Sequence, residues 1–429
     1  MKSFFKKITI AIVTYEAKLV LKKYKPKIIA ITGSVGKTGT KESLYSVLKK
    51  TFFVYRSETS SSNEISVPLA ILGCPNSDVS PFFWLRNILH GISLLVFRHV
   101  YPQWIILEIR SERPGDVEKV SKWLKADIVI FTLLGEMPTH VEFFDSVEHL
   151  AQEKLCLINS LKEDGLLILN SDDERIFELG SENKYKIISY GFGKNAQVKA
   201  GKTKILYKAK KPTGLYFELK DNSHTVSIEL KNVFGKHHIY SALVAYIVGS
   251  NLKIKENDIL EALADYVPPA GRLRIVEGVK GSTIIDDTYN SSPVAVFAGL
   301  ETLKKIKTKG KKIAVLGDML ELGKYTVDAH KEIGLATGEV INLLLVVGPR
   351  AQYIKEGALA SSLSEKNIIE FKDSKQAGKY LETVLEDGDI VFVKGSQVMR
   401  MEHTVEEIMA HPENKKQILV RQGKEWERN

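Results

Sequence analysis

Residues 27–41 run Lys27-Ile-Ile-Ala-Ile-Thr-Gly-Ser-Val-Gly-Lys-Thr-Gly-Thr-Lys41, the most informative stretch of the chain. The β-branched apolar run Ile28–Ile31 predicts a buried strand. A turn bracketed by Gly33 and Gly36 follows, and a helix is expected to run from Lys37 to Leu48. Strand, glycine turn and helix together form the context that a phosphate-binding loop requires.

In such a loop the backbone N–H groups of Gly33, Ser34, Val35 and Gly36 and the helix N-terminus face an anion. Lys37 would reach the terminal phosphates, and the Thr38 hydroxyl could hold Mg²⁺. The alternative is an ordinary strand-to-helix turn, because Ile31 stands where the common eight-residue pattern has glycine. The context on both sides favours a site for a nucleoside triphosphate.

Composition places the chain among globular proteins of two or three domains, with 429 residues, 44% apolar and 26% charged. The net charge of +9 favours anionic ligands. Without a basic stripe interleaved with aromatic residues, nucleic-acid binding is not expected. Cys74 and Cys156 form no metal-type pair and indicate reduced thiols in a cytosolic protein.

The apolar runs predict an α/β fold in two units. Residues 27–190 alternate strands and helices, as in a mainly parallel sheet, and residues 197–230 suggest a small antiparallel patch. Pro268-Pro-Ala-Gly271 is the best domain boundary. The expected organisation is an N-terminal amphipathic helix (1–26), a central phosphate-loop domain (27–268) with an apolar helical insertion (80–103), a second, Rossmann-like α/β domain (269–412) and a charged, solvated tail (413–429).

Four strand candidates of the second unit run directly into polar or glycine loops. In open parallel sheets ligands bind at such carboxyl ends, so these loops are where chemistry is expected. The strands and their loops are Ser282–Ile285 with 286–290, Lys312–Leu316 with 317–319, Leu343–Val347 with 348–349, and Ile390–Val393 with 394–396.

Two further residues of the central unit follow predicted strands. Glu108 ends the strand Trp104–Glu108, where a carboxylate can join the loop hydroxyl around Mg²⁺. His140 follows the next strand on the same edge of the sheet. The alternatives are a solvent-facing glutamate and a histidine with a structural hydrogen bond.

These motifs together resemble the Mur ligases. The resemblance covers about residues 27–410, and the stretch Gly317-Asp-Met-Leu-Glu-Leu-Gly323 is rather specific to the member that joins D-alanyl-D-alanine to a nucleotide-linked muramoyl tripeptide. The matching motifs are 32–38, 63–68, 107–108 with 114–115, His140 with Lys154, 271–273, 285–293, 315–323 with His330, and 393–396 with 399–401.

The resemblance implies ATP- and Mg²⁺-dependent amide formation through an acyl phosphate. Lys37 and Mg²⁺ at Thr38 and Glu108 would neutralise the phosphates, and His140 would hold a second Mg²⁺. Lys154 would be carbamylated by CO₂, which turns a cation into an anion able to face that metal; the alternative is a solvated helix lysine.

The resemblance also assigns residues on the far side of the cleft. Arg272 would contact phosphate or ribose, Asp286 or Asp287 the ribose or metal edge, and Tyr289 and Asn290 the nucleotide. Asn63, Glu64, Lys394 and Ser396 would face the acid or the amine. A helix N-cap is the alternative for the acidic pair.

Three departures from the family pattern matter. His238 and Ser241 stand where asparagines near adenine are usual. The segment Glu108-Ile-Arg-Ser-Glu-Arg113 replaces small and polar residues and is expected to border the substrate. Only 26 residues precede the first strand, too few for the usual uridine-nucleotide-binding domain.

The preferred interpretation is therefore a monomeric, cytoplasmic ligase of peptidoglycan precursor synthesis, which joins a muropeptide-like acid to an amino acid or to a dipeptide such as D-alanyl-D-alanine. The alternatives are a relative with a different acid, such as a lipid-linked or polyglutamate-type substrate, and a phosphate-loop ATPase. Residues 1–24 and 80–103, apolar with basic residues, are expected to pack on the core or to make a peripheral contact with the inner face of a membrane.

Overall fold

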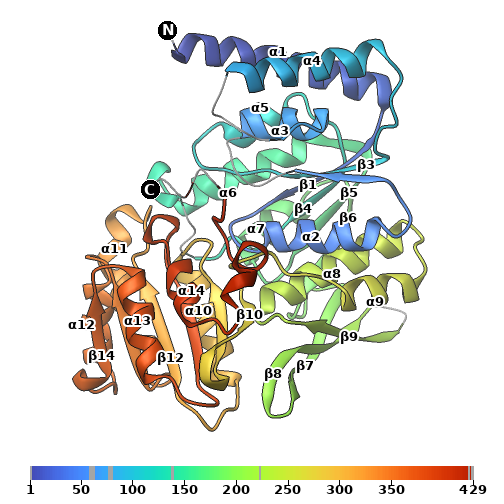
Figure 1. Ribbon diagram of the computed structural model, residues 1–429. Helices are drawn as coiled ribbons and strands as arrows, with labels where there is room; N and C mark the ends of the chain where they lie inside the picture. The colour runs from blue at the N-terminus through green and yellow to red at the C-terminus, as the bar shows by residue number, and fades with distance from the viewer. Residues whose placement is uncertain are drawn as a thin grey trace.

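The computed structural model describes residues 2–57, 63–75, 81–136, 140–221, 224–423 and 426. Two β-sheets form the centres of two α/β units, and helices cover both faces of each sheet (Figure 1). This architecture confirms the predicted fold class. The predicted boundary at Pro268 lies between the last helix of the first unit and the first strand of the second.

The central sheet has nine strands in the order β2-β3-β1-β4-β5-β6-β7-β8-β9. Strands from β2 to β7 pair in parallel, whereas β7, β8 and β9 pair antiparallel. The antiparallel patch is thus a continuation of the parallel sheet. The strands are β1 Lys27–Thr32, β2 Val54–Arg56, β3 Trp104–Glu108, β4 Ala126–Phe131, β5 Leu161–Asn170, β6 Lys186–Gly191, β7 Val198–Lys208, β8 Lys211–Lys220 and β9 Thr225–Lys231.

Two apolar cores flank the central sheet because its strands alternate their side chains between the faces. One core lies under α2, α8 and α9, and the other lies under α3, α5, α6 and α7, with α1 and α4 packed outside α3 (Figure 1). The helices are α1 Lys2–Tyr24, α2 Lys37–Leu48, α3 Asn63–Leu72, α4 Pro81–Val96, α5 Asp116–Ser121, α6 Val147–Leu155, α7 Glu174–Ser181, α8 Lys236–Asn251 and α9 Glu256–Ala264.

The second sheet has six strands in the order β10-β11-β15-β12-β13-β14, all parallel except β10. Its strands are β10 Arg274–Glu277, β11 Thr283–Asp287, β12 Lys312–Gly317, β13 Leu343–Val347, β14 Ile368–Phe371 and β15 Ile390–Lys394. Its helices are α10 Pro293–Lys305, α11 Thr326–Thr337, α12 Gln352–Leu359, α13 Ser374–Val384, α14 Glu402–Ile408 and α15 Lys415–Ile418.

The tail after Pro412 is not a solvated helix, which corrects the prediction. Among the described residues of the tail, a 3-10 turn at Pro412–Asn414 and the short α15 are helical, and Leu419 and Val420 are buried. The Arg421 guanidinium lies 3.0 Å from the Glu402 carboxylate and also donates to the backbone oxygens of Thr288 and Tyr289. The charged tail, predicted to be exposed to solvent, therefore fixes the loop after β11 through the hydrogen bonds of Arg421.

Candidate active site

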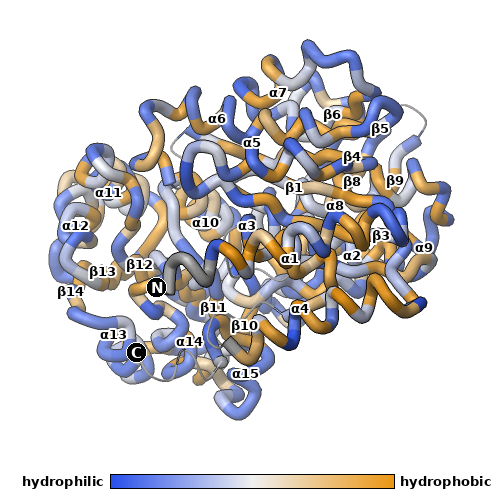
Figure 2. Tube along the Cα trace, turned by 90° about the horizontal axis from the view of Figure 1, so that it is seen from above, coloured by the Kyte–Doolittle hydropathy of each residue, from blue (hydrophilic) through white to orange (hydrophobic). Residues whose placement is uncertain are grey.

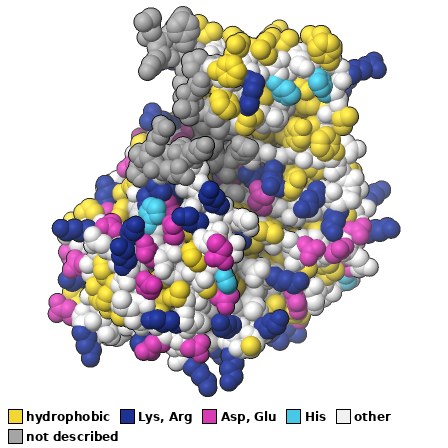
Figure 3. Space-filling view, in the orientation of Figure 1, with side chains coloured by type: hydrophobic (Ala, Val, Ile, Leu, Met, Phe, Trp, Pro, Cys, Tyr) yellow, Lys and Arg dark blue, Asp and Glu magenta, His cyan; other side chains and the backbone are white. Residues whose placement is uncertain are grey.

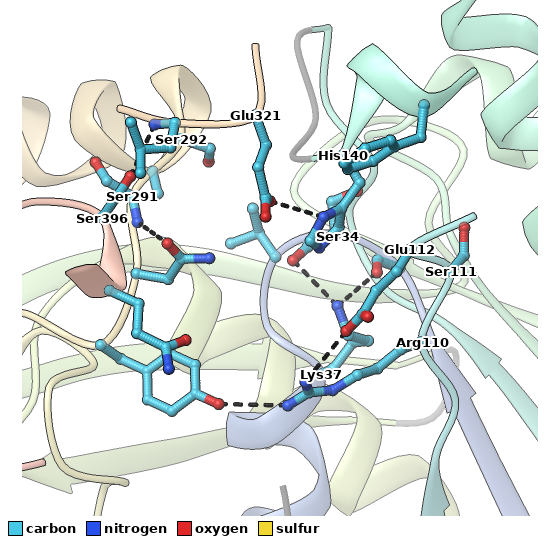
Figure 4. Close-up of a pocket in the computed structure, with 18 of the residues that line it drawn as sticks. Ser34, Lys37, Arg110, Ser111, Glu112, His140, Ser291, Ser292, Glu321 and Ser396 are labelled. Carbon is cyan, nitrogen blue, oxygen red and sulfur yellow. Dashed lines mark hydrogen bonds and ion pairs between the residues drawn. The ribbon is translucent and has the colours of Figure 1, made fainter. Parts of the chain in front are cut away.

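A cavity of about 400 Å³ lies between the two units, at the carboxyl ends of β1, β3 and β11 (Figure 4). A smaller adjoining cavity continues along the phosphate loop towards α10. Most of the predicted site residues line one or both cavities. They are Gly33, Ser34, Val35, Gly36, Lys37, Thr38, Glu108, His140 and Lys154 from the central unit, and Arg272, Asp287, Tyr289, Asn290, Lys394 and Ser396 from the second.

The phosphate loop has the conformation that its glycines permit. Gly33 and Gly36 have φ angles of 141° and 92°, which L-residues with a side chain rarely adopt. A Cβ atom at Gly33 would also collide with the Thr132 side chain. Only glycine allows the loop to pass this close to the strand end of β4.

Lys37 folds back over this loop. Its Nζ donates to the backbone oxygens of Gly33 at 2.7 Å and Ser34 at 3.3 Å. Burial lowers the pKa of Lys37, the Glu108 carboxylate opposes this effect in part, and the resulting pKa is about 8. The ammonium therefore lies where an anion at the loop would meet it.

Thr38 and Glu108 lie together, as predicted for a metal site. The Thr38 hydroxyl is 3.1 Å from Glu108 Oε2, and both side chains are buried. Burial alone would raise the pKa of Glu108, but Lys41, Lys37 and the arginines 110 and 272 hold it below its ordinary value. The pair offers the hard oxygen donors that Mg²⁺ accepts, and the described residues hold no cluster of three acidic, histidine or cysteine ligands. Thr38 and Glu108 would therefore suit an ion whose remaining ligands are water and phosphate oxygens.

His140 contacts the second unit. Its Nδ1 atom lies 2.7 Å from Glu321 Oε2, and this contact holds the pKa of the Glu321 carboxyl below its ordinary value (Figure 4). Both residues have left-handed backbones, with φ of 67° and 62°. Such conformations in residues other than glycine are uncommon and concentrate at functional sites.

Lys154 is buried, which rules out the solvated helix lysine. Its Nζ donates to the Gly33 oxygen at 3.2 Å. Burial, together with the neighbouring Lys37, lowers the pKa of this amine well below its ordinary value. A neutral amine is the form that reacts with CO₂, so the environment suits carbamylation, which stays a prediction.

The second unit closes the cavity with stacked and paired side chains. The Arg272 guanidinium lies 4.0 Å from the Tyr289 ring centre, an attractive cation–π contact. Lys394 Nζ lies 2.6 Å from Asp287 Oδ2, and both are buried. Ser396 accepts a bond from the Leu320 N–H and faces the larger cavity.

Three predicted site residues face elsewhere. Asp286 accepts from the Gly271 N–H and from the backbone and hydroxyl of Thr288, so it closes a local turn and lines neither cavity. Asn63 exchanges two hydrogen bonds with the Arg110 backbone. Glu64 pairs with Lys119 at the surface. These placements favour structural roles, although ligand contact by these residues stays a prediction.

The segment after Glu108 lines the larger cavity, as the sequence indicated. Arg110 contributes a guanidinium that lies 3.3 Å from the Tyr289 hydroxyl and 3.4 Å from the Glu112 carboxylate (Figure 4). Ser111, Glu112 and Arg113 line the same wall. This side of the cavity is therefore charged where the family pattern is small and polar.

Sequence reasoning missed two charged partners. Lys41 is buried 3.6 Å from Glu108 Oε2 and donates to the Ser57 oxygen, but in the sequence it is one of many helix lysines. The second is Glu321, which contacts His140. It lies within the 317–323 motif, but the sequence indicated no role for it.

His238 and Ser241, the two departures near the expected adenine position, make internal contacts. His238 is fully buried, and its Nε2 donates to the Arg272 oxygen at 2.7 Å. Ser241 donates to the His237 oxygen and lies 3.2 Å from the Thr40 hydroxyl. They tie α8 to the linker between the units and to α2.

Comparison with known proteins agrees with this arrangement. The Mur ligase middle domain matches residues 88–249, and the Mur ligase glutamate ligase domain matches residues 271–397. The UDP-N-acetylmuramoyl-tripeptide–D-alanyl-D-alanine ligase of Bacillus subtilis is 27% identical over 400 residues, which cover 92% of this chain and 79% of that protein.

Solved structures show the same fold. The MurF ligase of Thermotoga maritima in complex with ADP has a TM-score of 0.76 at 24% identity and covers 93% of this chain and 83% of its own. MurF of Acinetobacter baumannii has a TM-score of 0.74 at 21% identity, with 92% and 79% covered. The two family domains match in order, one within each unit, and the chain belongs to the Mur ligase family of ATP-dependent acid–amino-acid ligases.

Proposed function

We propose that the chain joins D-alanyl-D-alanine to a UDP-N-acetylmuramoyl-tripeptide with ATP, in the synthesis of peptidoglycan precursors. The observation that carries the proposal is a pair of adjoining cavities in which a phosphate loop, an oxygen-donor pair, the half-buried Lys37 and the buried Lys154 face the second unit. The similar ligase of Bacillus subtilis, whose name gives these two substrates, supports their choice.

In the first step a carboxylate oxygen of the acid attacks the γ-phosphorus of ATP, and ADP leaves with the electrons of the broken P–O bond. Lys37 and the N-terminus of α2 would neutralise the negative charge of the phosphates. Thr38 and Glu108 would hold Mg²⁺, which supplies further charge neutralisation when bound. The chain's part is positioning and electrostatics, not strong base chemistry.

In the second step the amine nitrogen attacks the carbonyl carbon of the acyl phosphate, inorganic phosphate leaves, and the nitrogen loses a proton. Ser396 and the loop after β11 would border the amine. Lys154 would act as its carbamate: its neutral Nζ forms an N–C bond to CO₂ and loses a proton, which leaves an anion beside the loop. With His140, this anion would hold a second Mg²⁺.

The test is amine-dependent release of phosphate. The purified chain is given ATP, Mg²⁺ and the UDP-linked tripeptide, with and without D-alanyl-D-alanine, and phosphate and the amide product are measured. We expect both only when acid and amine are present together. Equal phosphate release without the amine would identify an ATPase instead.

A second candidate keeps the chemistry and changes the acid, because Arg110 and Arg113 add positive charge to the wall next to Glu108. An acid with an additional anionic group, lipid-linked or of the polyglutamate type, would match this wall. The same assay with these acids distinguishes the candidates, because the natural acid should give the highest kcat/KM. Arg110→Ala should lower kcat/KM most for an acid whose additional anionic group binds this wall.

We propose that the chain acts as a monomer in the cytoplasm, where ATP and soluble precursors are available. Within the residues that the structure describes, every helix is too short or too polar to cross a membrane.

A further inference from the structure

Helix α4 turns an apolar stripe to solvent. Phe82, Leu85, Leu89, Ile92 and Val96 follow one another at intervals of three or four residues, which places them on one face of a helix. Their exposed fractions run from 44% to 73%. A surface helix of a globular protein ordinarily turns such a stripe to the core.

The inner side of α4 mixes apolar residues with small and polar ones, and Trp84, Ile88 and Leu95 pack there against the core. Asn87 and Gly91 lie there, and a Cβ atom at Gly91 would collide with the Glu16 side chain of α1. Leu94 is buried on the same side. The helix is thus apolar on two sides, one packed against the core and the other, the stripe, facing solvent.

Contacts with α1 hold α4 in this orientation. Lys23 Nζ donates to the backbone oxygens of Leu94, Leu95 and Phe97 at 2.6–2.9 Å, and the Tyr24 hydroxyl donates to the Leu94 oxygen at 2.9 Å. These bonds satisfy the free carbonyl groups at the end of α4. Rotation of the stripe towards the core would break them.

Helix α1 and the residues after α4 enlarge the exposed apolar surface. Ten of the nineteen large apolar side chains that are exposed in the described chain belong to it. We call this surface the α1–α4 face; Figure 2 shows the two helices adjacent to each other, and Figure 3 shows its apolar side chains gathered over them. Its exposed apolar members are Ile8, Ile12, Tyr15, Phe82, Leu85, Leu89, Ile92, Val96, Phe97 and Val100.

The charge of the chain is concentrated in the same two segments. Residues 1–26 hold seven lysines and one glutamate, and residues 81–103 hold two arginines and no acidic residue, so these segments carry +8 of the net +9. The glutamate is Glu16, which is buried. The apolar stripe therefore has basic neighbours and no exposed carboxylate within its own segments.

We propose that the α1–α4 face binds the surface of an anionic lipid bilayer. Exposed aliphatic and aromatic side chains enter the interface between headgroups and acyl chains, and lysines and arginines pair with anionic headgroups. The apolar stripe could also suit a second copy of the chain. Such a dimer would bring together segments that carry a net charge of +8 in each copy, and these repel one another. This proposal does not rest on the ligase reaction proposed above.

Sedimentation with vesicles tests the proposal. The full chain is spun with vesicles of phosphatidylcholine alone or with about 30 mol% phosphatidylglycerol. We compare it with Leu85→Glu/Leu89→Glu and with the control Leu335→Glu/Leu359→Glu, which changes two exposed leucines of α11 and α12. Thermal unfolding of each variant reports whether the fold is intact.

The wild type and the control should sediment with the anionic vesicles, and the α4 variant should bind at least about tenfold more weakly. Salt of about 0.5 M should weaken the wild-type binding, because screening shortens the reach of charge. A wild type that stays in the supernatant, or that binds neutral and anionic vesicles equally, overturns the proposal. A wild-type dimer that the α4 changes convert to monomer would identify a second copy as the occupant and overturn it as well.

Discussion

His238 makes the stability of this chain sensitive to acid, and His238→Asn should remove part of that sensitivity. The neutral ring donates from Nε2 to the Arg272 oxygen, and it is fully buried. Burial lowers the pKa of His238 to about 4 from the ordinary 6.5, and the Arg272 guanidinium acts in the same direction against the bond to the Arg272 oxygen. An asparagine amide can donate to the same oxygen and has no charge to acquire.

The direction and the magnitude of this pH dependence follow from proton binding by His238 in the folded and unfolded states. Because the folded-state pKa is the lower one, the unfolded chain binds the proton more readily between pH 6.5 and about 4, and stability falls as the pH falls through this range. The two pKa values correspond to a loss of about 2 kcal/mol between neutral pH and pH 5 and of about 3 kcal/mol below pH 4. Above about pH 7.5 this residue contributes almost no pH dependence, because it is then neutral in both states.

Urea unfolding, followed by tryptophan fluorescence at about pH 7.5 and about pH 5, measures this loss. The difference in unfolding free energy between the two pH values should be about 2 kcal/mol smaller in His238→Asn than in the wild type. His411→Asn, at an exposed position, is the control and should retain the wild-type difference. An equal difference in the wild type and His238→Asn would refute the reasoning.

Four further predictions concern the cavity. Lys37→Ala should lower ATP turnover by at least about a hundredfold with unchanged thermal unfolding, since the lysine faces phosphates; full ligase activity would remove the loop assignment. Glu108→Gln should raise the Mg²⁺ concentration for half-maximal activity by about tenfold or more, because the carboxylate loses its charge; an unchanged titration would place the metal elsewhere. Lys154→Ala should be nearly inactive and partly rescued by short carboxylates, whereas an active Lys154→Arg with a plain amine in the mass spectrum of the wild type would refute the carbamate. Glu321→Gln should weaken the contact between the units and raise KM for the substrates more than it lowers kcat; unchanged kinetics would show that the contact is incidental.

Much of the fold was predictable because the strands are local features. Runs such as Ile28–Ile31 and Trp104–Glu108 are apolar, β-branched or aromatic, and they end in polar loops. The phosphate loop and the Thr38–Glu108 pair followed from the same logic, since parallel strands bring their carboxyl ends to one edge. These signals lie within a few residues of one another or depend only on sheet topology.

The residues that were missed depend on long-range packing. Glu321 meets His140 across the two units, 181 positions away in the chain, and no local pattern indicates such a partner. Lys41 looks like a solvated lysine until β3 and the residues after β2 enclose it. Arg421 lies in a charged tail, and its guanidinium meets the buried Glu402 carboxylate only once the tail packs on the second unit.

Asn63 shows how the α1–α4 face relates to the cavity. Its side chain fixes the backbone of Arg110, whose own side chain lines the cavity wall, and contact with substrate stays a prediction for Asn63. Asn63 is the first residue of α3, and α3 packs against both α1 and α4. The apolar face and the arginine wall are therefore parts of one packed unit, so a bilayer that binds the face also sets the distance and direction of Arg110 from the lipid surface. For this reason lipid-linked acids belong in the substrate assay beside the soluble nucleotide-linked tripeptide.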